Sequence, residues 1–262
     1  MSFADYRAAL ARQRVDENLV ALATVDSTNR FARTLVDRLG AGCPPTTVLA
    51  WAQRAGRGRL GRSWSSPAGR GVYASLVRRV ASEELLAVPL LTGVGLATGI
   101  ERVTGVGCRL KWPNDVLVGG RKLAGVLVES VGASRGRAAS VVIGFGVNIA
   151  HDRSQLPGAD ATSIELETGS SIALAPLVAA LVAAVDDELR RAGEEGYAVA
   201  RFSELMAHRI GERLTCRLAG GSVSGELAGF ERRGLLRLVV AGEERWLAAA
   251  ELEGTAGEGL AC

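Results

Sequence analysis

The chain has 262 residues, with 48% hydrophobic and 23% charged side chains, a formal net charge of +3 and a pI near 8.9. Such a balance is typical of an ordinary globular protein that buries a sizeable core. No run approaches the roughly 18 apolar residues of a membrane span, and the N-terminal segment MSFADYRAALARQRVDE lacks the apolar region of a signal peptide. We therefore expect a cytoplasmic protein that does not associate with a membrane.

The first part of the chain predicts a helix, a strand and a second helix. Apolar residues at helical spacing predict a short surface helix over about residues 1–14. NLVALATV predicts a strand, and a helix follows to about Leu39. Ser27 or Thr28 could simply cap this helix. Alternatively, the strand end and the helix start present hydroxyl, amide and backbone N–H groups to a small polar ligand.

Two predicted strands, TTVLAWA and GVYASLVRR, flank the segment QRAGRGRLGRSWSSPAGRG (residues 53–71), here called the Arg/Gly loop. It has five arginines and five glycines, and no Asp or Glu occurs between Arg38 and Glu83. Glycine lets the backbone approach a ligand closely, and guanidinium groups bind carboxylates and phosphates through paired hydrogen bonds. Because strands hold both ends, we predict a loop that closes over an anionic ligand. A nucleic-acid-binding segment and a plain solvated loop are the alternatives.

The middle of the chain predicts a helix over residues 82–103, followed by the strand CRLKWP. The segment NDVLV-GG-RKLAGVLVES predicts a β-hairpin, because Gly119-Gly120 between two apolar runs is a strong turn signal. ASVVIGFGVNIA predicts a central strand. Residues 151–168 predict an irregular loop, and two helices are expected over residues 176–191 and 197–210.

The hairpin carries the second group of candidate functional residues, Lys111-Trp112-Pro113-Asn114-Asp115 and Arg121-Lys122-Leu123-Ala124-Gly125. Lys111 and Lys122 flank one hairpin, so the two cations can converge at one of its ends. The third group is Gly144-Phe145-Gly146-Val147-Asn148, with glycines where a side chain would block a ligand. A bulged strand is the alternative interpretation of these glycines.

Short alternating strands over residues 213–253 predict a small β-barrel of about SH3 size. We place the domain boundary near Gly211, which divides the chain into a catalytic domain (1–211) and a small β domain (212–262). The tail from Gly254 onward is expected to be mobile.

Histidine and cysteine usage limits the chemistry. With only His151 and His208, neither histidine-based catalysis nor a zinc site is expected. The four cysteines form no CxxC pair, so we expect reduced thiols, as in cytosolic proteins. They are Cys43, Cys108, Cys216 and Cys262.

Taken together, these motifs resemble those of the biotin protein ligases. They occur in that family's order across roughly residues 20–150, and GRGRxGR, KWPND and RKLAG in one chain are a specific combination. The resemblance implies an α+β fold, with a mixed β-sheet catalytic domain of the biotin/lipoate ligase type and a C-terminal SH3-like β-barrel. The matching segments are Ser27-Thr28-Asn29, Gln53, residues 55–62, Lys111–Asp115, Arg121–Gly125 and Gly144–Asn148.

The resemblance also implies a reaction. ATP and Mg²⁺ would activate biotin to biotinyl-5′-AMP, and a lysine of a carboxylase biotin carrier domain would then attack this mixed anhydride and release AMP. A carboxylate that meets a polyphosphate needs fixed cations around it. No Walker A sequence is present, so side chains and the loop backbone must hold the phosphates.

Roles for individual residues follow from the same resemblance. Asp115 would receive the incoming lysine or serve Mg²⁺. The residues implied for catalysis are Lys122, Arg59, Lys111 and Asp115. Those implied for biotin binding are Ser27, Thr28, Asn29, Gln53, Gly56, Arg57, Gly58, Arg59 and Lys122. Those implied for nucleotide binding are Arg57, Arg59, Trp64, Lys111, Asn114 and Asn148.

The chain departs from the family pattern at two points. Trp51 stands where the family often has Glu, so the support of that strand is expected to differ. Larger members carry an N-terminal winged helix-turn-helix that represses biotin genes, whereas only about 25 residues precede Ser27. We therefore expect no sequence-specific DNA binding. The alternatives to biotin ligation are lipoate or octanoate transfer by the same fold, and nucleic-acid binding through the Arg/Gly loop.

Overall fold

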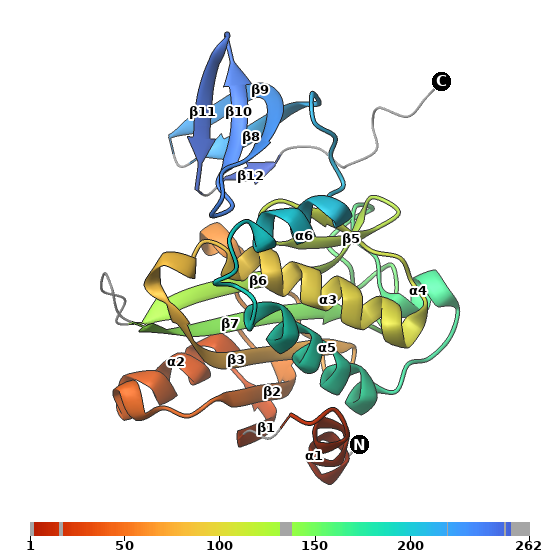
Figure 1. Cartoon of the computed structure of the whole chain (residues 1–262). Helices are drawn as coiled ribbons and strands as arrows, with labels where there is room; N and C mark the ends of the chain where they lie inside the picture. The colour runs from red at the N-terminus through yellow and green to blue at the C-terminus, as the bar shows by residue number, and fades with distance from the viewer. Residues whose placement is uncertain (1–2, 16–17, 132–137, 219, 249, 253–262) are drawn as a thin grey trace.

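A computed structural model of the chain describes residues 3–15, 18–131, 138–218, 220–248 and 250–252. Its larger unit is built on a seven-stranded mixed sheet with the strand order β1-β2-β3-β7-β6-β5-β4 (Figure 1). Only β1 and β2 pair in parallel. The strands are β1 (Asn18–Val25), β2 (Thr46–Gln53), β3 (Gly71–Ala81), β4 (Arg109–Lys111), β5 (Asp115–Val118), β6 (Arg121–Val131) and β7 (Ala138–Asn148).

Helices cover both faces of this sheet. Apolar side chains of α3 and α5 form one large core with strand residues such as Leu76 and Ile143. On the opposite face, Val36 of α2 packs against Val77 and Val142. The helices are α1 (Phe3–Arg12), α2 (Thr28–Leu39), α3 (Val88–Thr104), α4 (Ile164–Thr168), α5 (Leu174–Leu189) and α6 (Tyr197–Leu205).

Strand alternation decides what the α2 face can hold. Successive side chains of a strand point to opposite faces, so Val142, Gly144 and Gly146 of the central strand β7 share the face on which α2 packs. Along β7, Val142 fills this face with its side chain, whereas Gly144 and Gly146, nearer the start of α2, leave it open. The resulting recess positions the functional site.

The predicted α+β architecture is confirmed, but some elements differ from the prediction. The helix expected from residue 82 begins at Val88, because Pro89 lies in its first turn, where a missing N–H costs little. A short helix, α4, occupies part of the predicted irregular loop, with Ser163 accepting a hydrogen bond from Leu166 N as its N-cap. The helix expected to reach residue 210 ends at Leu205, because Ala207 N donates to Leu110 O at the sheet edge.

A second, five-stranded antiparallel sheet follows the larger unit, with the order β11-β10-β9-β8-β12 (Figure 1). It begins at Arg213 and is compatible with the predicted SH3-like barrel. Trp112 Nε1 donates to Gly234 O at 3.1 Å, which ties this sheet to the larger unit. The predicted mobile tail lies outside the described residues. The strands are β8 (Arg213–Leu218), β9 (Gly221–Phe230), β10 (Leu236–Val240), β11 (Glu243–Leu247) and β12 (Glu251–Leu252).

Three cysteines, Cys43, Cys108 and Cys216, are buried free thiols, and Cys262 lies outside the described residues. Burial raises the pKa of the Cys108 thiol to about 12, which keeps it protonated. Within the described part of the chain, every helix is too short or too polar to cross a membrane.

Candidate active site

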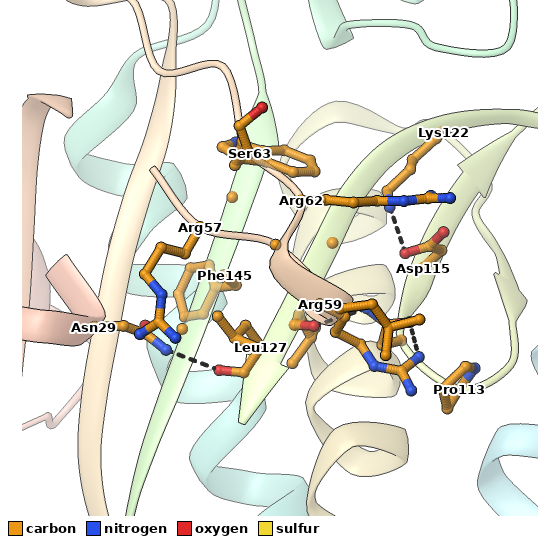
Figure 2. A pocket seen from close by; sticks show the side chains of 18 of the residues that line it. Asn29, Arg57, Arg59, Arg62, Ser63, Pro113, Asp115, Lys122, Leu127 and Phe145 are labelled. Atoms are coloured by element: carbon orange, nitrogen blue, oxygen red, sulfur yellow. Dashed lines mark hydrogen bonds and ion pairs between the residues drawn. The ribbon is translucent and has the colours of Figure 1, made fainter. Parts of the chain in front are cut away.

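One pocket collects most of the predicted site residues from segments far apart in the sequence (Figure 2). The start of α2, the end of β2, the Arg/Gly loop and the β4–β5–β6 segment all contribute to its lining. Ala250 and Leu252 bring the second sheet to the same pocket. The predicted residues that line it are Ser27, Thr28, Asn29, Gln53, Arg57, Gly58, Arg59, Trp64, Lys111, Asn114, Asp115 and Lys122.

Hydroxyl and amide groups at one end of the pocket form a connected cluster. Thr28 N and Oγ1 both donate to Gln53 Oε1, at 2.8 and 3.1 Å. Ser75 Oγ lies 2.8 Å from Thr28 Oγ1 and 2.6 Å from Asn29 Oδ1. Gln53 Nε2 donates to Ser66 Oγ at 2.8 Å. These bonds fix the orientation of each amide and hydroxyl, as recognition of a small polar ring requires.

Ser27 occupies the N-cap of α2, and its Oγ accepts from Arg30 N at 3.5 Å. The capping interpretation of the sequence is therefore confirmed for Ser27. Ser27 also lines the pocket, so a capping role and a ligand-facing position coexist in one residue.

The backbone of the Arg/Gly loop folds into a short hairpin of its own. Gly58 N donates to Arg62 O at 2.7 Å, and Trp64 N donates to Gly56 O at 2.9 Å. The tip turns through Leu60, which has φ 52° and a side chain pointing to solvent, with 64% of its surface exposed. An ordered hairpin, rather than a structureless tail, covers the pocket.

Arginine side chains of this loop reach partners on other elements. Arg57 Nη1 lies 3.0 Å from Glu129 Oε1 on β6. Arg59 Nη1 donates to Asn114 Oδ1 at 3.0 Å and to Ala250 O at 3.2 Å. Arg57 therefore ties one side of the loop to the large sheet, and Arg59 bridges both sheets. Figure 2 shows Arg57 next to Asn29, and Arg59 on the side of the pocket where Pro113 lies.

Lys122 faces the pocket from the start of β6, as the hairpin pattern predicted. Its Nζ lies 2.6 Å from Asp115 Oδ1 and 5.6 Å from the centre of the Trp64 ring. Lys111 is the register partner of Asp115 and lines the same pocket. The arrangement offers a cation held between a carboxylate and an aromatic face.

The glycines of the sheet make room for side chains of the protein itself. A Cβ on Gly144 would overlap the Asn29 amide, and one on Gly146 would overlap the Trp64 indole. A Cβ on Gly125 would lie 3.0 Å from Trp64. The sequence assigned this space to a ligand, whereas Asn29 and Trp64 fill the part that lies directly over the glycines.

Two predicted residues lie outside the lining of the pocket. Gly56 is buried behind it, where a Cβ would lie 2.7 Å from Ser66 Oγ. Asn148 is buried, and its Nδ2 donates to Thr162 O at 3.0 Å. Trp51, the departure from the family pattern, is 46% exposed and packs against Gly69 of the Arg/Gly loop.

Sequence reasoning missed two polar residues of the site. Ser75 is completely buried on β3, and a lone serine within the apolar run VYASLV was the available signal. Glu129 accepts from Asn29 Nδ2 at 2.9 Å as well as pairing with Arg57. Nothing in the sequence distinguishes this glutamate from a solvated strand residue, because its partners come from other segments.

The described residues contain no group of three or more His, Cys, Asp or Glu side chains placed to hold a metal ion. Burial and the nearby Arg70 guanidinium lower the pKa of His151, which therefore stays neutral at physiological pH. Neither His151 nor His208 lines the pocket.

Sequence comparison relates the chain to known proteins. The model of the "Biotin/lipoate A/B protein ligase family" matches residues 21–148. The biotin–[acetyl-CoA-carboxylase] ligase of Paracoccus denitrificans is 36% identical over 247 residues, covering 88% of this chain and 98% of the relative. The bifunctional ligase/repressor BirA of Bacillus subtilis (strain 168) is 30% identical over 245 residues, covering 91% of this chain and 74% of the relative.

Structural comparison also finds biotin protein ligases. The biotin protein ligase from Aquifex aeolicus in complex with biotin and ATP is similar with a TM-score of 0.70 and 26% identity, over 90% of this chain and 97% of that one. The biotin protein ligase from Leishmania major in complex with biotinyl-5-AMP is similar with a TM-score of 0.63 and 27% identity, over 88% of this chain and 99% of that one.

Proposed function

Because the chain belongs to the biotin/lipoate A/B protein ligase family, we infer that it is an ATP-dependent biotin protein ligase. In the first half-reaction a carboxylate oxygen of biotin attacks the α-phosphorus of ATP, and pyrophosphate leaves. In the second, a lysine amine attacks the acyl carbon of biotinyl-5′-AMP, loses a proton and releases AMP.

One observation carries this function: a single pocket joins a polar, hydrogen-bonded end to a cationic end. Biotin has the same division, with a polar ureido ring at one end and a carboxylate at the other. We assign the ureido ring and its neighbourhood to Ser27, Thr28, Asn29 and Gln53. The backbone of Gly56 supports this end from behind.

The cationic end suits the carboxylate and the reacting phosphate. Arg57, Gly58 and Arg59 are assigned to close over these groups, since guanidinium groups bind both anions through paired hydrogen bonds. Lys122 touches the biotin carboxylate and the phosphate, where its charge stabilises the negative charge that develops during transfer. Its ion pair with Asp115 holds it in place until the substrate carboxylate arrives.

The nucleotide is assigned to the side of the pocket formed by Trp64, Lys111 and Asn114. The Trp64 ring offers an aromatic face, Lys111 is the register partner of Asp115, and Asn114 lines the same pocket. Asn148 is tied to Thr162 O, so its role toward the nucleotide stays a prediction that rests on the resemblance.

Mg²⁺ would neutralise part of the polyphosphate charge. Magnesium is commonly bound by one or two carboxylates together with substrate phosphates and water. Asp115 is the lining carboxylate that could serve it, which agrees with the lack of a larger ligand group among the described residues. Asp115 remains equally suited to receive the proton of the incoming carrier lysine.

The acceptor is proposed to be the biotin carrier domain of an acyl-CoA carboxylase, as the name of the Paracoccus relative indicates for that protein. We propose that sequence-specific DNA binding is not part of this function. Buried free thiols support a cytoplasmic location.

Native mass spectrometry after mixing the protein with biotin and MgATP tests the function. A retained mass equal to biotinyl-AMP, with pyrophosphate released, is expected, followed by transfer to a carrier lysine. Lipoate offered in competition should not displace biotin. Adduct formation with lipoate instead of biotin would assign the chain to the other branch of its family.

A further inference from the structure

Behind the pocket lining, between Arg57 and Asn29, lies a carboxylate that the reaction does not call for. Glu129 lies on β6, and its side chain is 19% exposed. Its Oε1 and Oε2 lie 3.0 and 3.3 Å from Arg57 Nη1. A negative charge at this position opposes the binding of a second anion, so its presence beside Arg57 needs a physical reason.

Glu129 is held by more than its ion pair. Asn29 Nδ2 donates to Glu129 Oε2 at 2.9 Å and to Leu127 O at 3.2 Å. Asn29 belongs to the polar cluster of the pocket, where Ser75 joins it to Thr28. The carboxylate therefore has a defined position even when Arg57 leaves it, because Asn29 remains as a donor.

Arg57 is less constrained than its partner. Its side chain is 43% exposed and belongs to a loop, whereas Glu129 belongs to an interior strand of the sheet. A half-exposed ion pair is worth little, because solvent screens it and two side chains must be ordered. Exchange of Arg57 from one carboxylate to another therefore costs little free energy.

We propose that Glu129 is a positioning residue that holds Arg57 at the pocket wall and releases it to the carboxylate or phosphate of the ligand. The proposal rests on the proposed function. Glu129 keeps Arg57 ordered near its working position, which lowers the entropic cost of loop closure when the ligand binds. In return it competes with the ligand anion, so biotin affinity is set below the value that the free guanidinium would allow.

Arg57 has one anionic partner both before and after the ligand binds. Before binding, Arg57 pairs with Glu129; after binding, Arg57 pairs with the ligand anion, and Glu129 keeps the hydrogen bond from Asn29. Glu129→Gln tests this directly, because the amide oxygen can still accept from Asn29 while the competing charge is gone. A purely structural role predicts weaker binding in this variant, and the exchange predicts tighter binding.

The experiment is isothermal titration calorimetry of the full chain with biotin and with biotin methyl ester, which carries no charge. Glu129→Gln should bind biotin about threefold to fivefold more tightly, the upper part of the range expected when a half-exposed ion pair no longer competes. Its affinity for the ester should stay within about twofold of the parent. Glu129→Asp, which keeps the charge, should bind biotin less tightly than Glu129→Gln.

Two further variants make the result specific. Glu167→Gln is the matched control, since Glu167 pairs with Arg121 at 2.8 Å and its partners lie outside the pocket lining, whereas those of Glu129 belong to it. It should leave biotin affinity unchanged. In an Arg57→Gln background, Glu129→Gln should give no gain. Equal or weaker biotin binding by Glu129→Gln, or a gain that persists without Arg57, would overturn the proposal. Failure of the parent to bind biotin would instead overturn the proposed function.

Discussion

At the scale of single residues, Lys122 is the cation on which the first half-reaction should depend most. Lys122→Ala is expected to lower the rate of biotin-dependent ATP–pyrophosphate exchange at least about 100-fold, because one charged contact to the developing negative charge is lost. Thermal unfolding should change by only a few degrees, since Lys122 is partly exposed.

Arg121→Ala provides the matched control for Lys122. Arg121 neighbours Lys122 on β6 but pairs with Glu167 outside the pocket lining. Its substitution should leave the exchange rate within about twofold of the parent. An Arg121→Ala defect as large as that of Lys122→Ala would mean that the strand, and not the lysine, supports the reaction.

His151 predicts a pH dependence of stability. Burial and the Arg70 charge lower its pKa in the folded state, whereas the unfolded chain has the ordinary value of 6.5. As pH falls below 6.5, the unfolded chain binds a proton that the folded protein refuses, so the free energy of unfolding decreases, by at most about 1.4 kcal/mol per pH unit. His151→Asn should flatten this dependence in urea titrations between pH 7.5 and pH 5.5. Parallel curves for parent and variant would refute this assignment.

At the scale of elements, the Arg/Gly loop should gain order when a ligand binds. Its hairpin rests on a few backbone bonds and on half-exposed arginine pairs, so local opening costs little free energy. Trypsin should therefore cut after Arg57, Arg59 or Arg62 in the free protein. Biotin with MgATP should protect these bonds, because the reactive adenylate must be shielded from water.

Mass spectrometry of the tryptic fragments measures this protection. Cleavage after Arg233, in an exposed turn of the second sheet, serves as the internal control and should not respond to ligand. Equal cleavage of the loop with and without ligand would show that it does not close.

At the scale of the whole molecule, the second sheet takes part in the site through Arg59, which donates to Ala250 O. Gly234 allows the second sheet to pack closely on α3, because a Cβ at this position would lie 2.5 Å from Leu90 Cδ1. Gly234→Ala should therefore shift this sheet, loosen the loop tip and raise the Michaelis constant for biotin severalfold. Steady-state kinetics of carrier biotinylation measures the change.

Gly242→Ala is the control for Gly234→Ala. Both glycines have positive φ, 97° and 86°, so both substitutions introduce backbone strain of about 1–3 kcal/mol. Gly242 has no heavy atom within 4 Å of the added Cβ, so its variant should lose stability and keep parental kinetics. Equal kinetic defects in the two variants would show that backbone strain, and not the position of the second sheet on α3, is the cause.

Local patterns in the sequence determined much of this protein. Alternating apolar residues specified the strands, the pair Gly119-Gly120 specified the hairpin turn, and the motifs around Arg57 and Lys122 indicated an anion-binding pocket and a family. These signals are local because strand alternation, turn geometry and charge content are properties of short segments.

Only the tertiary structure decided which residues meet. Glu129 pairs with Arg57 across 72 positions and with Asn29 across 100, and Arg59 reaches Ala250 across 191. Partners this far apart in the chain leave no mark on a local pattern. The same holds for the glycines of β7, whose neighbours are Asn29 and Trp64. A glycine in a sequence indicates that a side chain is absent at that position, and only the packing of the folded chain determines which group fills the space.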